Sequence, residues 1–308
     1  WMLRQLNLSN WNVSNVTNMS CMFKKCMLLK NLEISNWDTR NVNNMSCMFS
    51  DCHLLSCLNL SNWNVNNVTD MSDIFYQCRS LTTINLSGWD TRNVNNMSCM
   101  FQNCYSLRTI NVSEWNTSNV KYLTGMFSDC KNLIRIDGIK DWNVSNVISF
   151  GSLYNGKGMF YQCSSLTSVD VSNWNTERAI NMDNLFYGCK SLLSVDLGNW
   201  NTQNVTSCSQ MFSECDSMIA LSLGKQTKII DDANILEAKW KRKSTGETYQ
   251  TKQLYNVYTS IGDTETFYRN ITINFNPNGG IGSKKINTYA DYKYSDTSVA
   301  HPWRLGYT

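Results

Sequence analysis

Residues 36–55 read NWDTRNVNNMSCMFSDCHLL, and variants of this stretch recur along most of the 308-residue chain. The tryptophans mark the recurrence, because they return every 26 residues or slightly more. The series is Trp11, Trp37, Trp63, Trp89, Trp115, Trp142, Trp174 and Trp200. A fixed period between 20 and 50 residues is typical of a solenoid, in which similar units stack on one another.

Each unit contains two apolar patterns. The first is an L-x-x-L-x-L segment such as Leu29, Leu32 and Ile34, whose alternation predicts a short strand with one buried face. The second is a stripe at i, i+3, i+4 and i+7, which predicts a short helix. In the quoted unit the stripe consists of Met45, Met48, Phe49 and Cys52. One strand and one helix cannot bury both faces alone, so stacking is required. We therefore expect an α/β solenoid of the leucine-rich-repeat type, with 26-residue repeats of one parallel strand and one helix.

The repeats end near residue 224, which sets the expected domain organisation. All 13 Cys and all 14 Met precede residue 225. We expect a solenoid of about eight rungs over residues 1–224, a β-rich linker module over 225–270, and an incomplete β repeat over 271–308. A small β region thus follows the solenoid.

Two parts of the sequence resemble known families. The frame of residues 36–55, which recurs over about residues 1–224, resembles the BspA-type leucine-rich repeat of bacterial surface proteins. Residues 271–280 (ITINFNPNGG) and 304–308 (RLGYT) resemble the Listeria–Bacteroides repeat found in internalin B-type proteins. The resemblance implies a secreted or wall-attached bacterial protein, located outside the cell, at the cell surface or in the cell wall. It also implies adhesion to a host or neighbouring-cell surface protein or glycan, with the cell wall as a further partner.

Composition and missing motifs narrow the function. The net charge of +3, with 17% charged residues, does not suggest nucleic-acid binding. No run approaches the roughly 18 apolar residues of a membrane-spanning helix. Two His and no nucleotide-binding fingerprint lead us to expect no enzyme, cofactor or metal site. The favoured function is a non-enzymatic extracellular scaffold for binding and adhesion. The alternatives are a structural wall or surface-layer component, and a glycan-directed enzyme that uses a row of Asp residues.

The outward side chains of the predicted strands are the first candidate ligand site. They would line the concave face, which solenoids commonly use for binding. The row is Glu33, Asn59, Asn85, Asn111, Asp137, Asp170 and Asp196. A second row runs beside it through Asn31, Cys57, Thr83, Thr109 and Arg135. Short polar side chains suit hydrogen bonding to peptide backbone or glycan hydroxyls. The alternative is a solvated face whose Asn and Asp ladder serves stability alone.

An irregular repeat supplies the second candidate site. Six extra residues lie in or near Ser149–Lys157, and insertions in repeats map to loops that often lie on a binding face. We expect Phe150, Leu153 and Tyr154 to be exposed there as ligand contacts. The alternative is that these side chains fold back onto the core.

The cysteines and tryptophans each allow a structural and a functional interpretation. A cysteine 15 residues after most of the repeat tryptophans falls on the apolar stripe, as Cys52 does after Trp37. Buried thiols are the favoured interpretation, and inter-rung disulfides or metal binding are the alternatives. The tryptophans are best interpreted as structural corners. A ladder that stacks on carbohydrate is the alternative.

Overall fold

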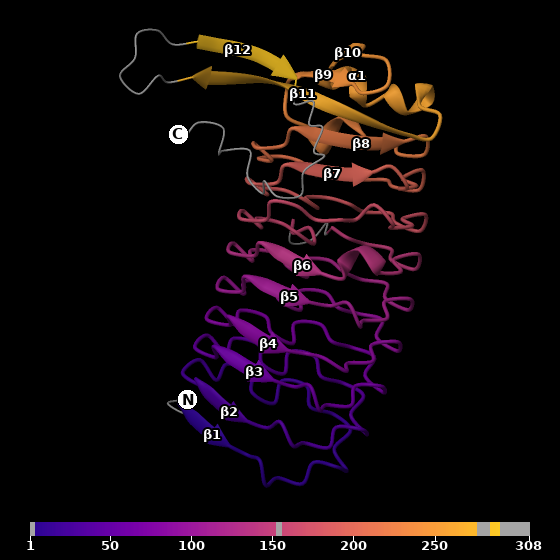
Figure 1. Ribbon diagram of the computed structural model, residues 1–308. Coiled ribbons are helices and arrows are strands. Elements are labelled where there is room, and N and C mark those ends of the chain that lie inside the picture. The colour runs from indigo at the N-terminus through magenta and orange to yellow at the C-terminus, as the bar shows by residue number, and fades with distance from the viewer. Residues whose placement is uncertain (1–3, 152–155, 276–283, 290–308) are drawn as a thin grey trace.

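The computed structural model describes residues 4–151, 156–275 and 284–289. It is a solenoid whose short strands lie side by side along one flank, followed by a cap of antiparallel strands (Figure 1). The strands of the solenoid are β1 (Gln5–Asn7), β2 (Asn31–Glu33), β3 (Cys57–Asn59), β4 (Thr83–Asn85), β5 (Thr109–Asn111), β6 (Arg135–Asp137), β7 (Ser194–Leu197) and β8 (Ala220–Gly224).

The rungs stack in parallel and in register. The pairs β1–β2, β3–β4, β5–β6 and β7–β8 are parallel ladders, and Leu58 lies opposite Ile84 in the second of these. A column of single bridges continues through all eight rungs at Asn18, Asn44, Asp70, Asn96, Tyr122, Ser149, Asn181 and Ser207. The predicted stacked repeats are therefore present in the described part of residues 1–224, that is, over 4–151 and 156–224.

The predicted helix of each repeat is wrong. Residues 45–52 form two consecutive β-turns, because the amide of Met48 bonds to the carbonyl of Met45 and that of Cys52 to the carbonyl of Phe49. The third residues of these turns, Cys47 and Asp51, have φ angles of 55° and 62°. A positive φ at this position is typical of a type II turn and interrupts a right-handed helix.

The turns replace helical hydrogen bonds with bonds between rungs. The amides of Met45, Cys47, Phe49 and Asp51 each donate to a carbonyl of the next rung. The same stripe is nevertheless fully buried, as the sequence predicted. The repeat is therefore a β-solenoid unit with turns where the spacing of the apolar stripe predicted a helix.

Two aromatic columns fill the interior. The phenylalanines from Phe23 to Phe212 stack rung on rung, with ring centroids 5.3–6.1 Å apart. The indole Nε1 of most repeat tryptophans donates to a carbonyl of the preceding rung, as Trp37 does to Leu8 at 2.9 Å. The donors are Trp37, Trp63, Trp89, Trp142, Trp174 and Trp200. These contacts confirm the structural interpretation of the tryptophans. Trp11 in the first rung differs, being 57% exposed.

The cysteine column is also part of the core. All 13 cysteines are free. In seven rungs the thiol contacts the phenylalanine carbonyl of the preceding rung, at 3.1 Å from Cys52 to Phe23. The thiols are Cys52, Cys78, Cys104, Cys130, Cys163, Cys189 and Cys215. Burial raises the pKa of Cys52 to about 12. The interpretation of this column as buried thiols is confirmed.

Antiparallel strands close the C-terminal end of the stack. β11 (Thr264–Phe275) pairs with β8 on one side and with β9 (Lys239–Arg242) on the other. β10 (Thr248–Gln250) pairs with β9, and the short helix α1 (Thr251–Leu254) follows it. Trp240 is fully buried, and its indole donates to the Thr251 hydroxyl at 3.1 Å. We call residues 225–275 the C-terminal cap.

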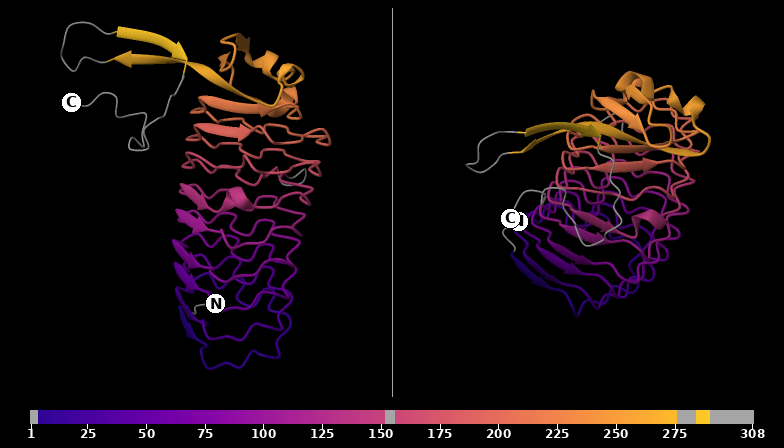
Figure 2. Two further views of the ribbon diagram at one scale, coloured as in Figure 1. Left: turned by 45° about the vertical axis from the view of Figure 1, so that its right-hand side comes forward. Right: turned by 45° about the horizontal axis from the view of Figure 1, so that its top comes forward.

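The cap changes the predicted domain boundaries. Residues 225–270, expected to be a linker, continue the solenoid sheet through the β8–β11 ladder. The boundary expected between residues 270 and 271 falls inside β11. β11 then extends past the rungs and pairs with β12 (Lys284–Tyr289), so that this hairpin projects from the side of the solenoid (Figure 2). In the described residues, no helix has the length and apolarity needed to cross a membrane.

Candidate functional site

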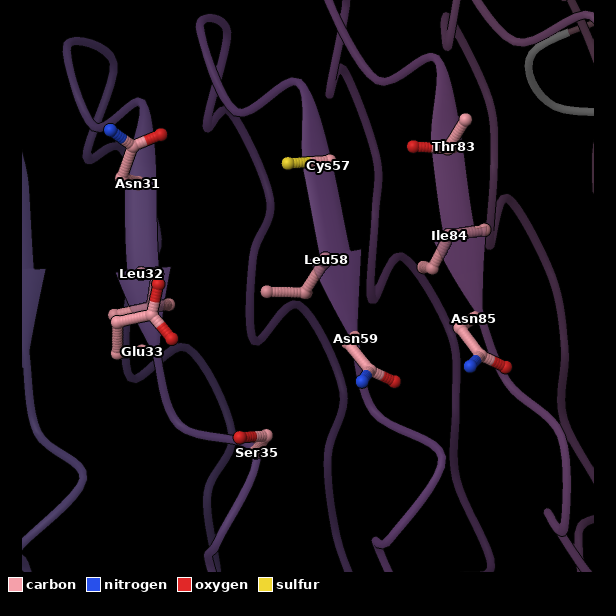
Figure 3. A pocket seen from close by; sticks show the side chains of 10 residues that line it. All are labelled: Asn31, Leu32, Glu33, Ser35, Cys57, Leu58, Asn59, Thr83, Ile84 and Asn85. Atoms are coloured by element: carbon pink, nitrogen blue, oxygen red, sulfur yellow. The ribbon is translucent and has the colours of Figure 1, made fainter.

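The outward side chains of β1–β6, which we call the strand face, contain a hollow of about 510 Å³. Its lining comes from β2, β3 and β4 (Figure 3). The lining residues are Asn31, Leu32, Glu33, Ser35, Cys57, Leu58, Asn59, Thr83, Ile84 and Asn85. Three residues of the predicted ligand row, Glu33, Asn59 and Asn85, are thus brought together on one surface.

The strand pattern explains why these side chains point outward. In β3 the flanking residues Cys57 and Asn59 are exposed and the central Leu58 is buried. In β4 the flanking residues are likewise exposed and the central Ile84 is half-buried, with Asn85 directly opposite Asn59 in the ladder. Because successive side chains of a strand alternate between faces, the last residue of each strand forms one column on the surface.

The asparagines of this column also end their strands. The Oδ1 atom of Asn59 accepts from the amide of Ser61 at 3.2 Å, and that of Asn85 accepts from the amide and the hydroxyl of Ser87. Asn111 binds the amide of Ser113 in the same way, at 3.0 Å. These Asx turns replace the backbone bonding that is lost where a strand ends. The asparagine ladder therefore stabilises the ends of the strands, and ligand binding by the same residues stays a prediction.

The Asx turns also fix the direction of each amide group. Since Oδ1 faces the chain, the Nδ2 donors of Asn59, Asn85 and Asn111 are left for other partners. Within residues 4–151, 156–275 and 284–289, no protein acceptor is present for these three groups. All three residues are exposed. The middle of the strand face is thus a column of hydrogen-bond donors.

The carboxylates of the predicted row are engaged within the protein. Asp137 pairs with Arg135 at 2.9 Å and Asp170 with Lys140 at 2.9 Å. Asp196 accepts from the amide of Gly198 at 2.8 Å. Asp137 and Asp170 therefore carry compensated charges, whereas Glu33 and Asp196 form no ion pair in the described part of the chain.

The electrostatics of Asp170 do not suit acid catalysis. Partial burial raises its pKa, but hydrogen bonds from Ser172 and Lys140 outweigh this effect, and the pKa lies below its ordinary value. A general acid needs a proton at neutral pH. The described residues also contain no group of three or more His, Cys, Asp or Glu side chains that could hold a metal ion.

The insertion places its first aromatic residue in the core. Phe150 is fully buried, and its ring stacks on Trp174 with centroids 5.4 Å apart. We expected Phe150 to be an exposed ligand contact, and that expectation is wrong. Phe150 occupies the position that Met45 has in its rung, since Ser149 is the bridging residue there as Asn44 is in the second rung. The predicted contacts Leu153 and Tyr154 lie outside the described residues.

The end of the insertion is joined to the neighbouring rungs. Lys157 pairs with Asp129 at 2.6 Å and lies 5.7 Å from the centre of the Tyr161 ring. Tyr161 stacks on Tyr187 with centroids 4.9 Å apart, and the Tyr187 hydroxyl donates to Glu214. This cluster lies on the turn side of the rungs, away from the strand face.

The second row of outward residues, which begins with Asn31, Cys57 and Thr83, was expected beside the first row but was not assigned to a site. Asn31, Cys57 and Thr83 form the other side of the hollow. They are the first residues of β2, β3 and β4, two positions before the predicted row. Because side chains alternate along a strand, both outward positions of each strand belong to the same surface, and this rule would have assigned these three residues to the site.

Comparison with known proteins identifies the repeat family. The profile of the family described as "Mycoplasma protein of unknown function, DUF285" matches residues 2–108, 82–156 and 152–232. The chain belongs to the DUF285 family. The matches together contain the strand face and the insertion of this DUF285 protein.

Other comparisons add little to the DUF285 assignment. No curated protein matches the chain. A solved structure titled "Crystal structure of TLR13-ssRNA13 complex" is 17% identical, with a TM-score of 0.25. The match covers 72% of the DUF285 chain, which spans only 36% of that structure's chain.

Proposed function

We propose that this DUF285 protein is an extracellular, non-enzymatic scaffold that binds a surface protein or glycan through its strand face. The observation that carries the proposal is the hollow over β2–β4, where exposed amide donors lack acceptors in the described parts of the protein. Exposed polar groups held in fixed directions lose little conformational entropy on binding.

The repeat architecture supports binding more than catalysis. Stacked rungs build an extended surface rather than a deep cavity, and such surfaces are the usual binding sites of solenoids. The resemblance of residues 36–55 to BspA-type repeats supports a place on the outside of a bacterial cell and a role in adhesion. The resemblance of residues 271–280 to internalin B-type repeats supports the same location.

The test is a binding screen of the purified chain against arrays of surface glycans and extracellular matrix proteins. We expect saturable binding to at least one of them. Replacing Asn59, Asn85 and Asn111 together by Lys should abolish it, because the long side chains at positions 59 and 85 would fill the hollow. Binding that survives the triple replacement would place the ligand elsewhere. Self-association in light scattering without any ligand would favour a structural wall component instead.

A further inference from the structure

Two cysteines lie one above the other on the turn side of the first two rungs. Cys21 and Cys47 are each the third residue of a β-turn, with φ angles of 58° and 55°. The amide of Cys21 donates to the carbonyl of Ser46 at 2.9 Å, which sets the two turns in register. We propose that Cys21 and Cys47 are a reversible redox site, at which a low-molecular-weight disulfide introduces a cross-link between adjacent rungs. The site lies away from the strand face, and the inference does not rest on the proposed function.

The spacing of the rungs suits a disulfide. Matching positions of adjacent parallel rungs are about 4.8 Å apart, within the roughly 4.4–6.8 Å that separates the Cα atoms of bridged cysteines. Because the two turns have nearly the same φ angle at the cysteine, the two side chains leave the backbone in similar directions. Bridging then requires the Cβ atoms to approach by roughly 0.3 Å or more, since bridged Cβ atoms lie within about 4.5 Å. A cross-link that needs this movement is easier to reduce, which favours a reversible bond.

The two thiols interact and differ in their access to solvent. Cys21 is exposed and Cys47 is half-buried. Burial is the main cause that raises the pKa of Cys47 to about 11, and the Asp73 carboxylate and a hydrogen bond with the Cys21 thiol act in the same direction. The Lys24 ammonium lowers the pKa of Cys47 and so favours its thiolate. Cys21 is therefore the thiol that an external disulfide reaches first, and Cys47 is the one that reacts from beside it.

The chemistry is thiol–disulfide exchange in two steps. In the first step the Cys21 thiolate attacks one sulfur of the small disulfide, a bond to Cys21 forms, and the other half leaves as a thiolate. In the second step the Cys47 thiolate attacks Sγ of Cys21 and expels the remaining half. The two protein thiols are oxidised, two electrons pass to the small disulfide, and the two protons end on the small thiols that are released.

The other cysteines lack this combination of a thiol neighbour and access. Three cysteines outside the core column have no cysteine at the matching positions of the rungs beside them, namely Cys57, Cys99 and Cys208. Within the core column Cys26 is half-buried, but its neighbour Cys52 is fully buried and contacts the Phe23 carbonyl at 3.1 Å. An external disulfide therefore finds an adjacent pair of thiols at Cys21 and Cys47.

The test uses glutathione as the probe. The reduced native protein is incubated with a series of ratios of oxidised to reduced glutathione. The remaining thiols are then blocked with N-ethylmaleimide, and the peptides from digestion with two proteases are mapped by mass spectrometry. We expect one intramolecular disulfide, between Cys21 and Cys47, which reduced glutathione reverses. Cys57 is the internal control, because it is exposed without a thiol neighbour and should collect only the mixed disulfide with glutathione.

Variants separate the two steps. In Cys47→Ser the mixed disulfide at Cys21 should persist, because no thiol is left to expel the glutathione. The matched control is Cys99→Ser, which changes a half-buried cysteine at the same turn position, with a φ of 57°, and should keep the cross-link. Circular dichroism checks that both variants fold.

The electrostatic role of Lys24 gives a kinetic readout. Lys24→Met should slow the closing step several-fold, because the Cys47 thiolate loses a favourable charge. Lys25→Met changes a neighbouring exposed lysine and should leave the rate as it is. In the parent protein the closing rate should rise with pH below the pKa of Cys47.

Three results would overturn the inference. The first is a mixed disulfide at Cys21 that does not close in the parent protein. The second is a cross-link elsewhere, either between Cys26 and Cys52 or between two chains through Cys21. The third is a Cys21 thiol that stays unmodified at every ratio of oxidised to reduced glutathione while Cys57 reacts.

Discussion

The indole Nε1 of Trp63 donates a hydrogen bond of 3.1 Å to the carbonyl oxygen of Ile34, 29 residues earlier in the chain. This bond joins two rungs inside the core, because Trp63 is only 1% exposed. Its ring also stacks on Trp37 at 5.9 Å. The tryptophans therefore hold the rungs together by polar and apolar contacts at once.

Replacing Trp63 by Phe should destabilise the solenoid. The change leaves the Ile34 carbonyl without a donor in a buried site, which costs about 1–3 kcal/mol, and adds a cavity. Urea unfolding followed by circular dichroism measures the loss. Trp11→Phe is the control, because Trp11 is 57% exposed and should change stability little. Equal effects of the two changes would contradict the role of the indole bond.

The thiols should react with a thiol reagent at two different rates, one fast and one slow. Cys21 and Cys57 are exposed, whereas the seven thiols of the core column are buried and bonded to carbonyls. We expect two thiols to react rapidly at neutral pH, because reactivity requires access and a thiolate. The double variant Cys21→Ser/Cys57→Ser should lose the fast phase, and the core column should react only in denaturant. Rapid labelling of Cys78 in the native protein, detected by mass spectrometry, would refute the assignment.

Stability should fall in alkaline solution. Burial raises the pKa of Cys52 and of Cys215 to about 12, from an ordinary value of 9.0. The folded state therefore keeps these protons while the unfolded state loses them. The stabilisation is complete below pH 9 and decreases as the pH rises from 9 toward 12. Urea midpoints between pH 7 and pH 10.5 measure the effect. In Cys52→Ser this decrease in stability should be smaller than in the parent protein.

Gly138 should tolerate no side chain. Its φ is 85°, and a Cβ atom there would lie 2.2 Å from the backbone Cα of Ser113. Gly138→Ala should therefore destabilise by more than about 1 kcal/mol. Gly246 has a φ of 76° but no heavy atom closer than 3.8 Å, so Gly246→Ala isolates the effect of backbone conformation. Thermal unfolding of both variants gives the comparison, and the steric argument fails if Gly246→Ala is the more harmful change.

The ion pair between Arg242 and Glu265 should stabilise the C-terminal cap. The two groups are 3.0 Å apart, and their side chains are 13% and 8% exposed. Arg242→Met leaves the buried Glu265 carboxylate with one partner fewer, at a cost of about 1–3 kcal/mol. Hydrogen exchange of the β9 and β11 amides reports the loss. Arg40→Met breaks an exposed pair with Asp38 and should have little effect.

The same pair gives the cap a pH dependence. Burial raises the pKa of Glu265, but hydrogen bonds from Ser244 and Arg242 lower it further, and the net direction is downward. The stabilisation is therefore present above the unfolded pKa and is lost as the pH falls through the folded pKa. The protection factors of the β11 amides against hydrogen exchange should fall in acid in the parent protein, and this fall should be smaller in Glu265→Gln.

The sequence predicted which side chains form the buried columns of the solenoid. It did not predict the backbone conformation of the residues that carry them. The spacing of Met45, Met48 and Phe49 fits one face of a helix, and it equally fits two type II turns. Only the non-local bonds, such as that from Cys47 to Ser72, distinguish the two conformations. The pairing of β11 with β8 could not be predicted from the sequence for the same reason, since it joins segments about 44 residues apart by backbone contacts.

The candidate site was partly predictable. Strand alternation placed Glu33, Asn59 and Asn85 on one surface, and the structure brings them together in the hollow. The Asx turns were missed, although an Asn two residues before a Ser at a strand end is their usual signal. Phe150 was misplaced because the insertion was taken to begin before it. Aligning Ser149 with Asn44 would have assigned Phe150 to the core.

The in-register ladder from Asn59 to Asn85 means that the length of the strand face is set by the number of repeats. Each added rung would lengthen the strand face by about 4.8 Å without changing the shape of any single position. The C-terminal cap contacts only the last rungs among the described residues, so its packing would be unaffected by rungs added in the middle of the stack. An insertion of two rungs between β3 and β4 would therefore lengthen this surface by about 9.6 Å and leave the local geometry of the other rungs unchanged.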